Sequence, residues 1–458
     1  MMLKTSKKNQ SYWLTSVFFT LAQRLSVMLV GIGSFLILVR VLSKDEMGIY
    51  ALFFTIITIF EVTRDGLVKN ALIRFINISP QEDNSLIQST ALILSLVYTL
   101  FFISLVLFGA KYLSIYWNTP QLTDMLYVYT VTALISVIFS HIEYIQQANL
   151  NFKSIFLIYF IKQGLFFLFI VLLVFIYKEV SLYNLAILQF VAVFIATIAG
   201  IVSARKIVLK NFRFSTAWIA EQWSYGKFVL ATNLSSQALR TVDHFLLASL
   251  VSPQAVALYN TSVRISNLLD MPSKAVAEAL FPKSVQKKSA GHGNEQVAQL
   301  YEQTTGSIIA VLAPMCLFIF IFPEFIIQII AGSKYLDAVP VLRIAVLYSL
   351  LLPFQKQFGT VMDATGRPKA NFIVNFILAI FNTIIVYYLV GKFGLTGAAY
   401  GLLSTIVLGL FINLIILRQY FGISIWNILK QMIIFYNIVL SYISNYIKYF
   451  SSKKKIFK

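Results

Sequence analysis

The chain has 458 residues, of which 59% are hydrophobic and only 12% charged, and its mean hydropathy is +0.79. Soluble proteins are about 45–50% apolar and about 25% charged, so this composition excludes an ordinary soluble enzyme or binding domain. The single cysteine, Cys316, excludes an internal disulfide and argues against a thiol or metal site.

Apolar runs of the length that a bilayer core requires recur along the whole chain, and they predict an all-α, polytopic membrane protein of about 12 transmembrane helices. In chain order, the predicted helices are 12–39, 47–63, 86–108, 124–147, 155–177, 181–203, 225–250, 254–281, 302–330, 338–361, 370–390 and 396–417. Arg24 interrupts the first apolar run, so we expect the first helix to be an uncleaved anchor rather than a signal peptide.

The net charge of +19 reflects basic residues that are distributed unevenly between the predicted loops on the two sides of the membrane. With the N-terminus in the cytosol, most loop cations face the cytosol, including Arg64 and Lys69, which we expect after the helix 47–63. This distribution fits the positive-inside rule and predicts an inner-membrane protein with a cytoplasmic N-terminus. The excess of basic residues therefore indicates the orientation of the chain in the membrane, and we expect no nucleic-acid partner.

The last segment, 423–450, fits either a thirteenth span or an amphipathic helix at the membrane surface. Its polar residues Lys430, Asn437 and Lys448 favour the interfacial helix, which keeps the basic tail cytoplasmic. The predicted domains are an N-terminal six-helix bundle (1–210), a C-terminal six-helix bundle (211–420), and this interfacial or extra helix with its tail (421–458).

A faint internal repeat supports two related halves. The segment VLSKDEMGIYAL (41–52) matches LVSPQAVALYNT (250–261), and ANLNFK (148–153) matches ATGRPK (364–369) in the same order. An even number of helices in each half gives both halves one orientation. The predicted relation is a pseudo-two-fold axis along the membrane normal, as in some transporters.

Several segments resemble the polysaccharide-repeat (O-antigen, Wzx-type) flippases of the multidrug/oligosaccharidyl-lipid/polysaccharide (MOP) exporter superfamily. They are DHFLLASLVSPQAVALYNTSVRI, ALFPKSV, AGSKYLDAVPVLRI, DATGRPKANFIVN, GLTGAAYG, LSKDEMGIYAL and DGLVKNALIRF, within about residues 15 to 418. The resemblance implies two MATE-like bundles around a central cavity and alternating access. It also implies outward transport of an undecaprenyl-pyrophosphate-linked oligosaccharide for O-antigen, capsule or exopolysaccharide synthesis. Polysaccharide polymerase and chain-length machinery are implied partners, and no cofactor is expected.

Arg240, Asp243 and His244 lie on one face of the predicted helix 225–250. Charges inside a membrane are costly and usually face a partner or a cavity. Two interpretations stay open. Arg240 and Asp243 neutralise each other at a helix seam, or Arg240 contacts a substrate anion in a wet cavity while Asp243 tunes it or takes a coupling proton.

Arg24 and Arg264 have no acid within one turn on their own helices. A lipid pyrophosphate suits them, since guanidinium groups match phosphate oxygens bidentately, but pairing with acids of other helices is equally open. The candidate substrate contacts are Arg24, Lys162, Arg240, Arg264 and Arg343. The candidates for ion coupling or cavity pairing are Glu61, Glu143 and Asp243. Cations outnumber acids in the predicted spans, which favours an anionic cargo.

Three other functions are open to a membrane protein of this kind. A membrane glycosyltransferase, polymerase or ligase usually presents acidic or histidine groups on a large outer loop, whereas the longest one here, 109–123, carries few. A multidrug antiporter of the same fold calls for an acidic cavity. A lipid II flippase is usually longer, with two extra helices. The sequence therefore predicts a transporter and not an enzyme.

Overall fold

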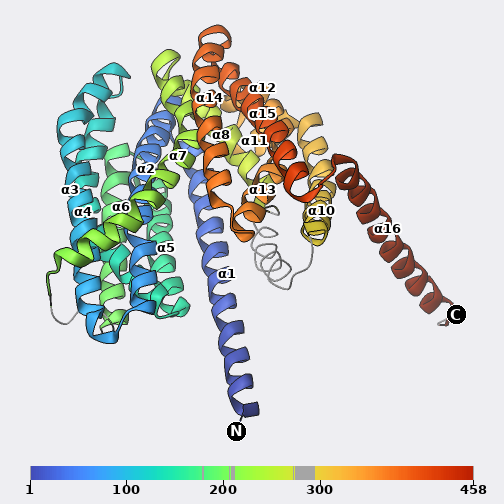
Figure 1. The fold of residues 1–458 in the computed structure, drawn as a ribbon. Helices are drawn as coiled ribbons and strands as arrows, with labels where there is room; N and C mark the ends of the chain where they lie inside the picture. Colours follow the sequence, from blue (N-terminus) through green and yellow to red (C-terminus); the bar gives the residue numbers. More distant parts are fainter. Residues whose placement is uncertain are drawn as a thin grey trace. The chain divides into compact units, whose positions relative to one another are not determined.

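The computed structural model describes residues 2–177, 180–205, 207, 212–271, 273 and 294–456 (Figure 1). Throughout these residues the regular elements are helices, as the composition predicts. The chain forms two compact units, Met1–Ala257 and Leu258–Lys458. The expected division into bundles at residues 210 and 211 stays a prediction.

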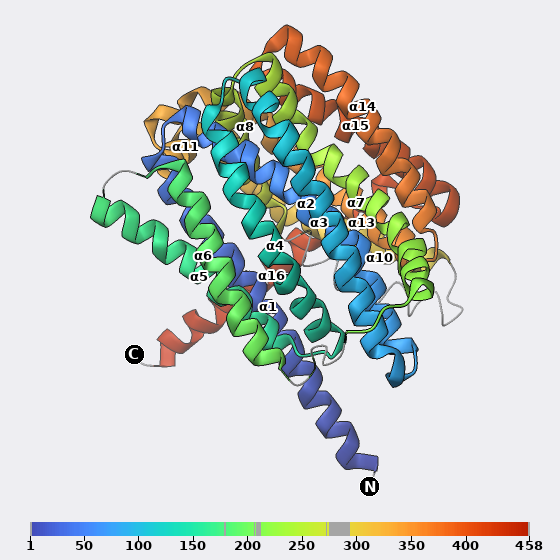
Figure 2. The same cartoon turned by 90° about the vertical axis from the view of Figure 1, so that its left-hand side faces the viewer.

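The first unit contains seven long helices in its described part and the first turns of an eighth. They are α1 (Met2–Val41), α2 (Lys44–Ile78), α3 (Asn84–Tyr116), α4 (Pro120–Ala148), α5 (Phe152–Tyr177), α6 (Leu182–Ala204), α7 (Thr216–Leu250) and α8 (Pro253–Leu269), with a short 3-10 turn, η1 (Gln81–Asp83). Helix α5 packs against α1 and α6, α4 packs against α6, α3 and α2, and α7 lies along α2. Figures 1 and 2 both show α4, α5 and α6 side by side.

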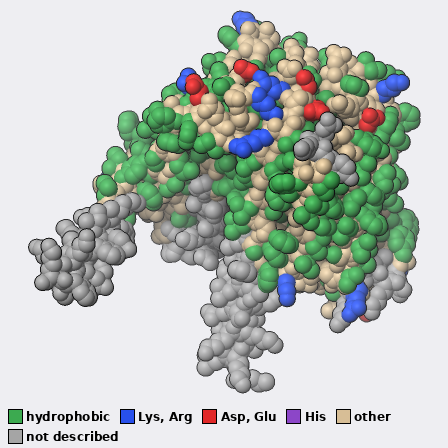
Figure 3. Space-filling view, turned by 180° about the vertical axis from the view of Figure 1, so that it is seen from behind, with side chains coloured by type: hydrophobic (Ala, Val, Ile, Leu, Met, Phe, Trp, Pro, Cys, Tyr) green, Lys and Arg blue, Asp and Glu red, His purple; other side chains and the backbone are tan. Residues whose placement is uncertain are grey.

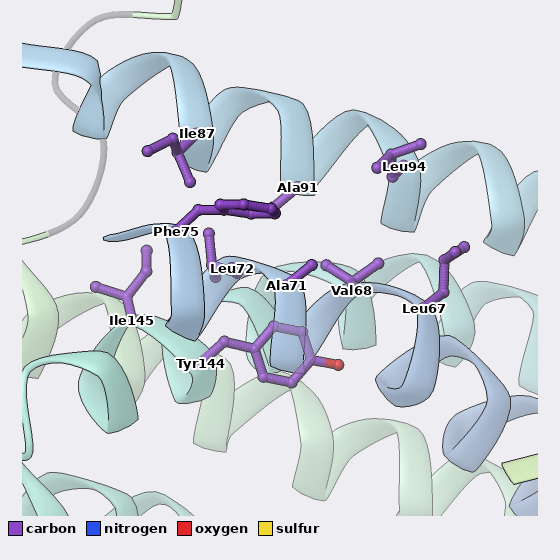
Figure 4. Close-up of a cluster of buried hydrophobic side chains, with 10 residues drawn as sticks. All are labelled: Leu67, Val68, Ala71, Leu72, Phe75, Ile87, Ala91, Leu94, Tyr144 and Ile145. Atoms are coloured by element: carbon purple, nitrogen blue, oxygen red, sulfur yellow. The ribbon is translucent and has the colours of Figure 1, made fainter. Parts of the chain in front are cut away.

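An apolar cluster holds α2 against α3 and α4 (Figure 4). Its members are Leu67, Val68, Ala71, Leu72, Phe75, Ile87, Ala91, Leu94, Tyr144 and Ile145. The α2 members recur at helical spacing, so one side of the helix is continuously apolar. Because lipid tails are as apolar as these side chains, the cluster holds the second half of α2 through close van der Waals packing rather than through removal from water.

Small residues let α7 approach α2 closely. A Cβ atom built at Gly226 would lie 2.0 Å from the carbonyl oxygen of Leu67, and one at Gly66 would lie 2.6 Å from Nδ2 of Asn233. At Gly226 the obstructing atom belongs to the backbone, so only glycine fits there, whereas a side chain at Gly66 would require Asn233 to shift. The Asn233 amide also donates a hydrogen bond of 2.9 Å to the carbonyl of Val62, which fixes the register of the two helices.

The second unit contains the rest of α8 and the helices that follow residue 293. These are α10 (Asn294–Ile321), α11 (Pro323–Ala331), η2 (Ser333–Ala338), α12 (Val339–Ser349), α13 (Leu352–Ala364), α14 (Pro368–Phe393), α15 (Leu395–Phe421) and α16 (Ile425–Ile456). Helix α15 packs against α14, α12 and α13, whereas α16 packs against α10.

The twelve predicted spans are all helical where the structure describes them, but two of them are broken. The predicted helix 302–330 divides at Phe322, because Pro323 starts a new helix, α11. The predicted helix 338–361 divides into α12 and α13, which meet at an angle of 41° and each carry a proline in the first turn. The end of the predicted helix 254–281 lies outside the described residues.

Within the described chain, nine helices are long and apolar enough to cross a membrane, or ten if α12 and α13 form one bent span. Helices α7 and α8 complete the twelve predicted spans but are not in this set. The surface agrees with a lipid environment, since Figure 3 shows broad areas of hydrophobic side chains on that face. The protein is a multi-pass membrane protein.

Candidate functional site

The first unit contains a cavity of about 420 Å³ between α1, α2, α4 and α5. Its polar lining includes Gln23, Arg24, Lys69, Glu143, Gln147 and Tyr159. The charged members are two cations and one acid, and apolar residues of α1 and α5 close the rest of the wall. The cavity is therefore amphipathic, and its polar side carries a cationic excess.

An ion pair joins α2 to α4 on the cavity wall. Lys69 Nζ lies 2.7 Å from Oε1 of Glu143, and the hydroxyl of Tyr159 on α5 donates a hydrogen bond of 2.8 Å to Oε2. The Lys69 side chain is 25% exposed and that of Glu143 is 8% exposed. Both oxygens of the acid are thus held from two different helices, and the ammonium is the more accessible partner.

The polar face of α2 continues away from the cavity through tyrosine–carboxylate contacts. The hydroxyl of Tyr144 donates a hydrogen bond of 2.5 Å to Oδ1 of Asp65, while its ring lies in the apolar cluster of Figure 4. The hydroxyl of Tyr129 donates a hydrogen bond of 3.0 Å to Oε1 of Glu61. Carboxylates that are partly removed from water need such donors, and α4 supplies them to the half-buried Glu61 and Asp65 of α2.

Arg64 is the most deeply buried cation of this face, at 2% exposure. Its two terminal nitrogens each donate a hydrogen bond of 2.7 Å, one to Ser136 and one to Ser140 of α4. The serines lie four residues apart, so one turn of α4 matches the fork of the guanidinium. The guanidinium also lies 5.0 Å from the ring centre of Phe60.

The prediction that Arg64 and Lys69 lie in a cytosolic loop is wrong. The predicted helix 47–63 continues to Ile78, and both residues are on α2. The physical reason is that the charges on one face of α2 find hydrogen-bond partners on α4, while its other face stays apolar. A signal was present in the sequence: Leu67, Val68, Ala71, Leu72 and Phe75 keep helical spacing beyond residue 63.

Four predicted site residues lie in this part of the first unit. Arg24 and Glu143 line the cavity. Glu61 accepts from Tyr129, outside the cavity lining. Lys162 Nζ lies 5.0 Å from the ring centre of Phe139 and 5.9 Å from that of Tyr159, so aromatic rings surround this cation.

The other predicted residues lie elsewhere. On α7, Arg240 is exposed, whereas Asp243 and His244 are buried at 1% and 7% exposure, so the three do not share one environment. In the second unit, Arg264 Nε donates a hydrogen bond of 3.1 Å to Oδ1 of Asn260, and Arg343 is exposed on α12.

Comparison with known proteins gives a family match. A family model described as "Polysaccharide biosynthesis protein" matches residues 37–340. An uncharacterized membrane protein of Methanocaldococcus jannaschii is 31% identical over 48% of this chain and 44% of its own length. A probable low-salt glycan biosynthesis flippase of Haloferax volcanii is 23% identical over 79% of this chain and 74% of its own length. The match thus covers less than half of the length of the Methanocaldococcus jannaschii protein.

Solved structures share the fold. An inward-facing multidrug resistance transporter of the MATE family, in the MOP superfamily, superposes with a TM-score of 0.75 and 15% identity, covering 86% of this chain and 95% of its own. The lipid II flippase MurJ, in an inward closed conformation, superposes with a TM-score of 0.69 and 15% identity over 93% of each chain. The fold is therefore that of the MOP superfamily.

Proposed function

We propose, from the premise that this chain belongs to the polysaccharide biosynthesis protein family matched over residues 37–340, that it is a flippase for a lipid-linked glycan. Its cargo is an oligosaccharide repeat unit on undecaprenyl pyrophosphate, destined for O-antigen, capsule or exopolysaccharide. It moves this cargo by alternating access from the cytoplasmic to the outer face of the inner membrane, with its N-terminus in the cytoplasm.

The observation that carries this proposal is the cavity with Arg24 and Lys69 on its wall. A diphosphate offers several oxygens to such cations, and an Arg–phosphate contact is bidentate and charge-assisted. A cation inside a span is costly, which makes an anionic ligand a good reason to keep it there. The apolar residues of α1 and α5 that complete the lining suit the lipid part of the same molecule.

The remaining expected contacts stay within the proposal. Lys162, Arg240, Arg264 and Arg343 are proposed as further contacts for the diphosphate or the sugars. Glu61 and Asp243 are proposed for ion coupling or internal pairing. A polysaccharide polymerase and chain-length machinery are proposed as the partners that receive the translocated unit.

A mass-spectrometric profile of polyprenyl-linked sugars in cells that lack this gene tests the function. Accumulated lipid-linked repeat units, with loss of the surface glycan, are expected, and they would also identify the cargo. Unchanged intermediates with an intact surface glycan would contradict the proposal. A drug-efflux assay on the same cells would then test the alternative, a multidrug or other lipid exporter of this fold.

A further inference from the structure

The cavity carries its own internal anion. Glu143 holds Lys69 at 2.7 Å, in the place that a phosphate oxygen would take beside this ammonium. The charged side chains of the lining are Arg24, Lys69 and Glu143. With the ion pair formed, one of the two cations is already neutralised at close range.

We propose that Glu143 is a built-in counter-anion, which a diphosphate oxygen of the substrate displaces from Lys69 on binding and which recaptures Lys69 on release. This inference rests on the proposed function, because it assigns the exchange to a diphosphate-bearing lipid. It says how Lys69 becomes available to an anion, and it gives Glu143 a defined role in setting the affinity for the diphosphate.

The first support is the way in which the acid is anchored. Oε2 of Glu143 accepts from Tyr159, and this contact is independent of the contact that Oε1 makes with Lys69. When Lys69 turns toward a ligand, the carboxylate therefore keeps a hydrogen-bond donor. A buried acid with no donor would make the exchange costly, and the tyrosine lowers that cost.

The second support is the difference in accessibility within the pair. The Lys69 side chain is three times as exposed as that of Glu143, 25% against 8%. A lysine ammonium sits on a flexible four-carbon stem, so it can change partner without movement of the helix. The ring of Tyr144, whose centre lies 5.7 Å from Nζ, is a contact that the ammonium can keep in either position.

The third support is electrostatic. A carboxylate on the wall repels an incoming phosphate and competes with it for the same cation, so Glu143 lowers the affinity of the site for anions. A transporter must also release its cargo, and an internal anion that recaptures Lys69 assists release. The opposite arrangement, in which Glu143 only positions Lys69 while the ammonium bonds both anions, predicts that removal of the acid weakens binding.

Calorimetric titration of the full-length, detergent-purified protein with farnesyl diphosphate separates these two arrangements. Glu143→Gln keeps the size of the side chain and an acceptor for Tyr159 but removes the charge. We expect it to bind farnesyl diphosphate at least about fivefold more tightly than the parent protein, as for a competing ligand of ordinary coupling strength, and with a steeper dependence on salt. Glu221→Gln is the matched control, because Glu221 is an exposed acid on α7 outside the cavity lining, and the affinity of this variant should be unchanged.

Lys69→Met should weaken binding, and in the double variant the gain caused by Glu143→Gln should shrink to the part that comes from relieved repulsion. If Glu143→Gln does not fold, Glu143→Asp replaces it: the shorter acid withdraws its charge from Lys69, and tighter binding is again expected. If the Glu143 variant binds farnesyl diphosphate as tightly as the parent protein or more weakly, the exchange is overturned. The flippase proposal then stays intact, provided that Lys69→Met and Arg24→Gln weaken binding. If neither of these two variants weakens binding, the cavity is not the diphosphate site, and both proposals lose their basis.

Discussion

Gln254 Nε2 donates a hydrogen bond of 2.9 Å to Oδ2 of Asp45, a residue 209 positions earlier in the chain. The same offset relates the sequence repeat 41–52 to 250–261, so residues at equivalent positions of the repeat contact each other. Their local structures also agree. Ser43 Oγ and Ser252 Oγ each accept, at 3.2 Å, from the backbone N–H three residues later, so both segments start a helix with the same side-chain cap.

Gly48→Ala should destabilise this contact. A Cβ atom at Gly48 would lie 1.9 Å from the carbonyl oxygen of Pro253, which is a backbone atom and cannot turn away. Overpacking of this kind costs about 1–3 kcal/mol, so a lower midpoint of thermal unfolding is expected for the purified protein.

Gly109→Ala is the matched control, because Gly109 is also helical and a Cβ there meets nothing within 4 Å. It should leave the midpoint unchanged or raise it slightly, since alanine favours helices over glycine. Equal midpoints for Gly48→Ala and the parent protein would contradict the close approach.

Arg64→Lys should lower the stability of the protein, because one ammonium cannot reproduce the two hydrogen bonds of the guanidinium to Ser136 and Ser140. Hydrogen bonds to a charged group contribute about 1.5–3 kcal/mol each. A double-mutant cycle between Arg64→Lys and Ser140→Ala, followed by thermal unfolding, should give a coupling energy clearly above zero. Additive effects of the two substitutions would argue against the fork arrangement.

Helix α2 shows what the sequence can and cannot predict. The sequence locates α5 and α6 well, because their apolar runs are long and each contains few charged residues. The sequence does not locate the end of α2, because Arg64, Asp65 and Lys69 resemble loop residues until their partners are known. Those partners, Ser136, Tyr144 and Glu143, lie more than seventy residues away, and no local pattern links them.

Only part of the candidate site is predictable from the sequence, because contacts between distant residues leave no local pattern. Arg24 and Glu143 were singled out because a charge within an apolar run is conspicuous on its own, and both line the cavity. Lys69 and Tyr159 were missed, since a lysine near a predicted helix end and a tyrosine in an apolar run are common. Their importance depends on three-dimensional proximity to Glu143.

In the second unit, Lys356 on α13 forms an ion pair with Asp270, and their side chains are 20% and 5% exposed. Removal of one partner from a buried pair costs about 3–5 kcal/mol, and the partial exposure of Lys356 places this pair toward the lower end. Asp270→Asn and Lys356→Met should each lower the thermal midpoint, and the reversed pair, Asp270→Lys with Lys356→Asp, should recover part of the loss. Single variants with the parent midpoint would show that the pair contributes little.

Helix α16 is held on α10 by a glycine contact and an acid. A Cβ at Gly306 would lie 2.6 Å from the carbonyl oxygen of Ile428, and Glu302 accepts from the backbone of Ser424 and the amide of Asn427 at 2.9 and 3.0 Å. Gly306→Leu should therefore detach α16, and limited trypsin digestion near Lys430 should become faster. Gly391→Leu is the control, because a Cβ there meets nothing within 4 Å. Unchanged digestion of Gly306→Leu would contradict the docking of α16.

Vesicle translocation tests most directly whether the protein moves a lipid diphosphate across the bilayer through the cavity beside α1. Purified full-length protein would be reconstituted with labelled lipid-linked oligosaccharide in one leaflet, and transfer would be followed by a membrane-impermeant reagent that oxidises the sugars. The account predicts rapid transfer for the parent protein, and loss of transfer for Lys69→Met and Arg24→Gln at equal reconstitution. Transfer by both variants at the parent rate, or no transfer by the parent protein above empty vesicles, would contradict it.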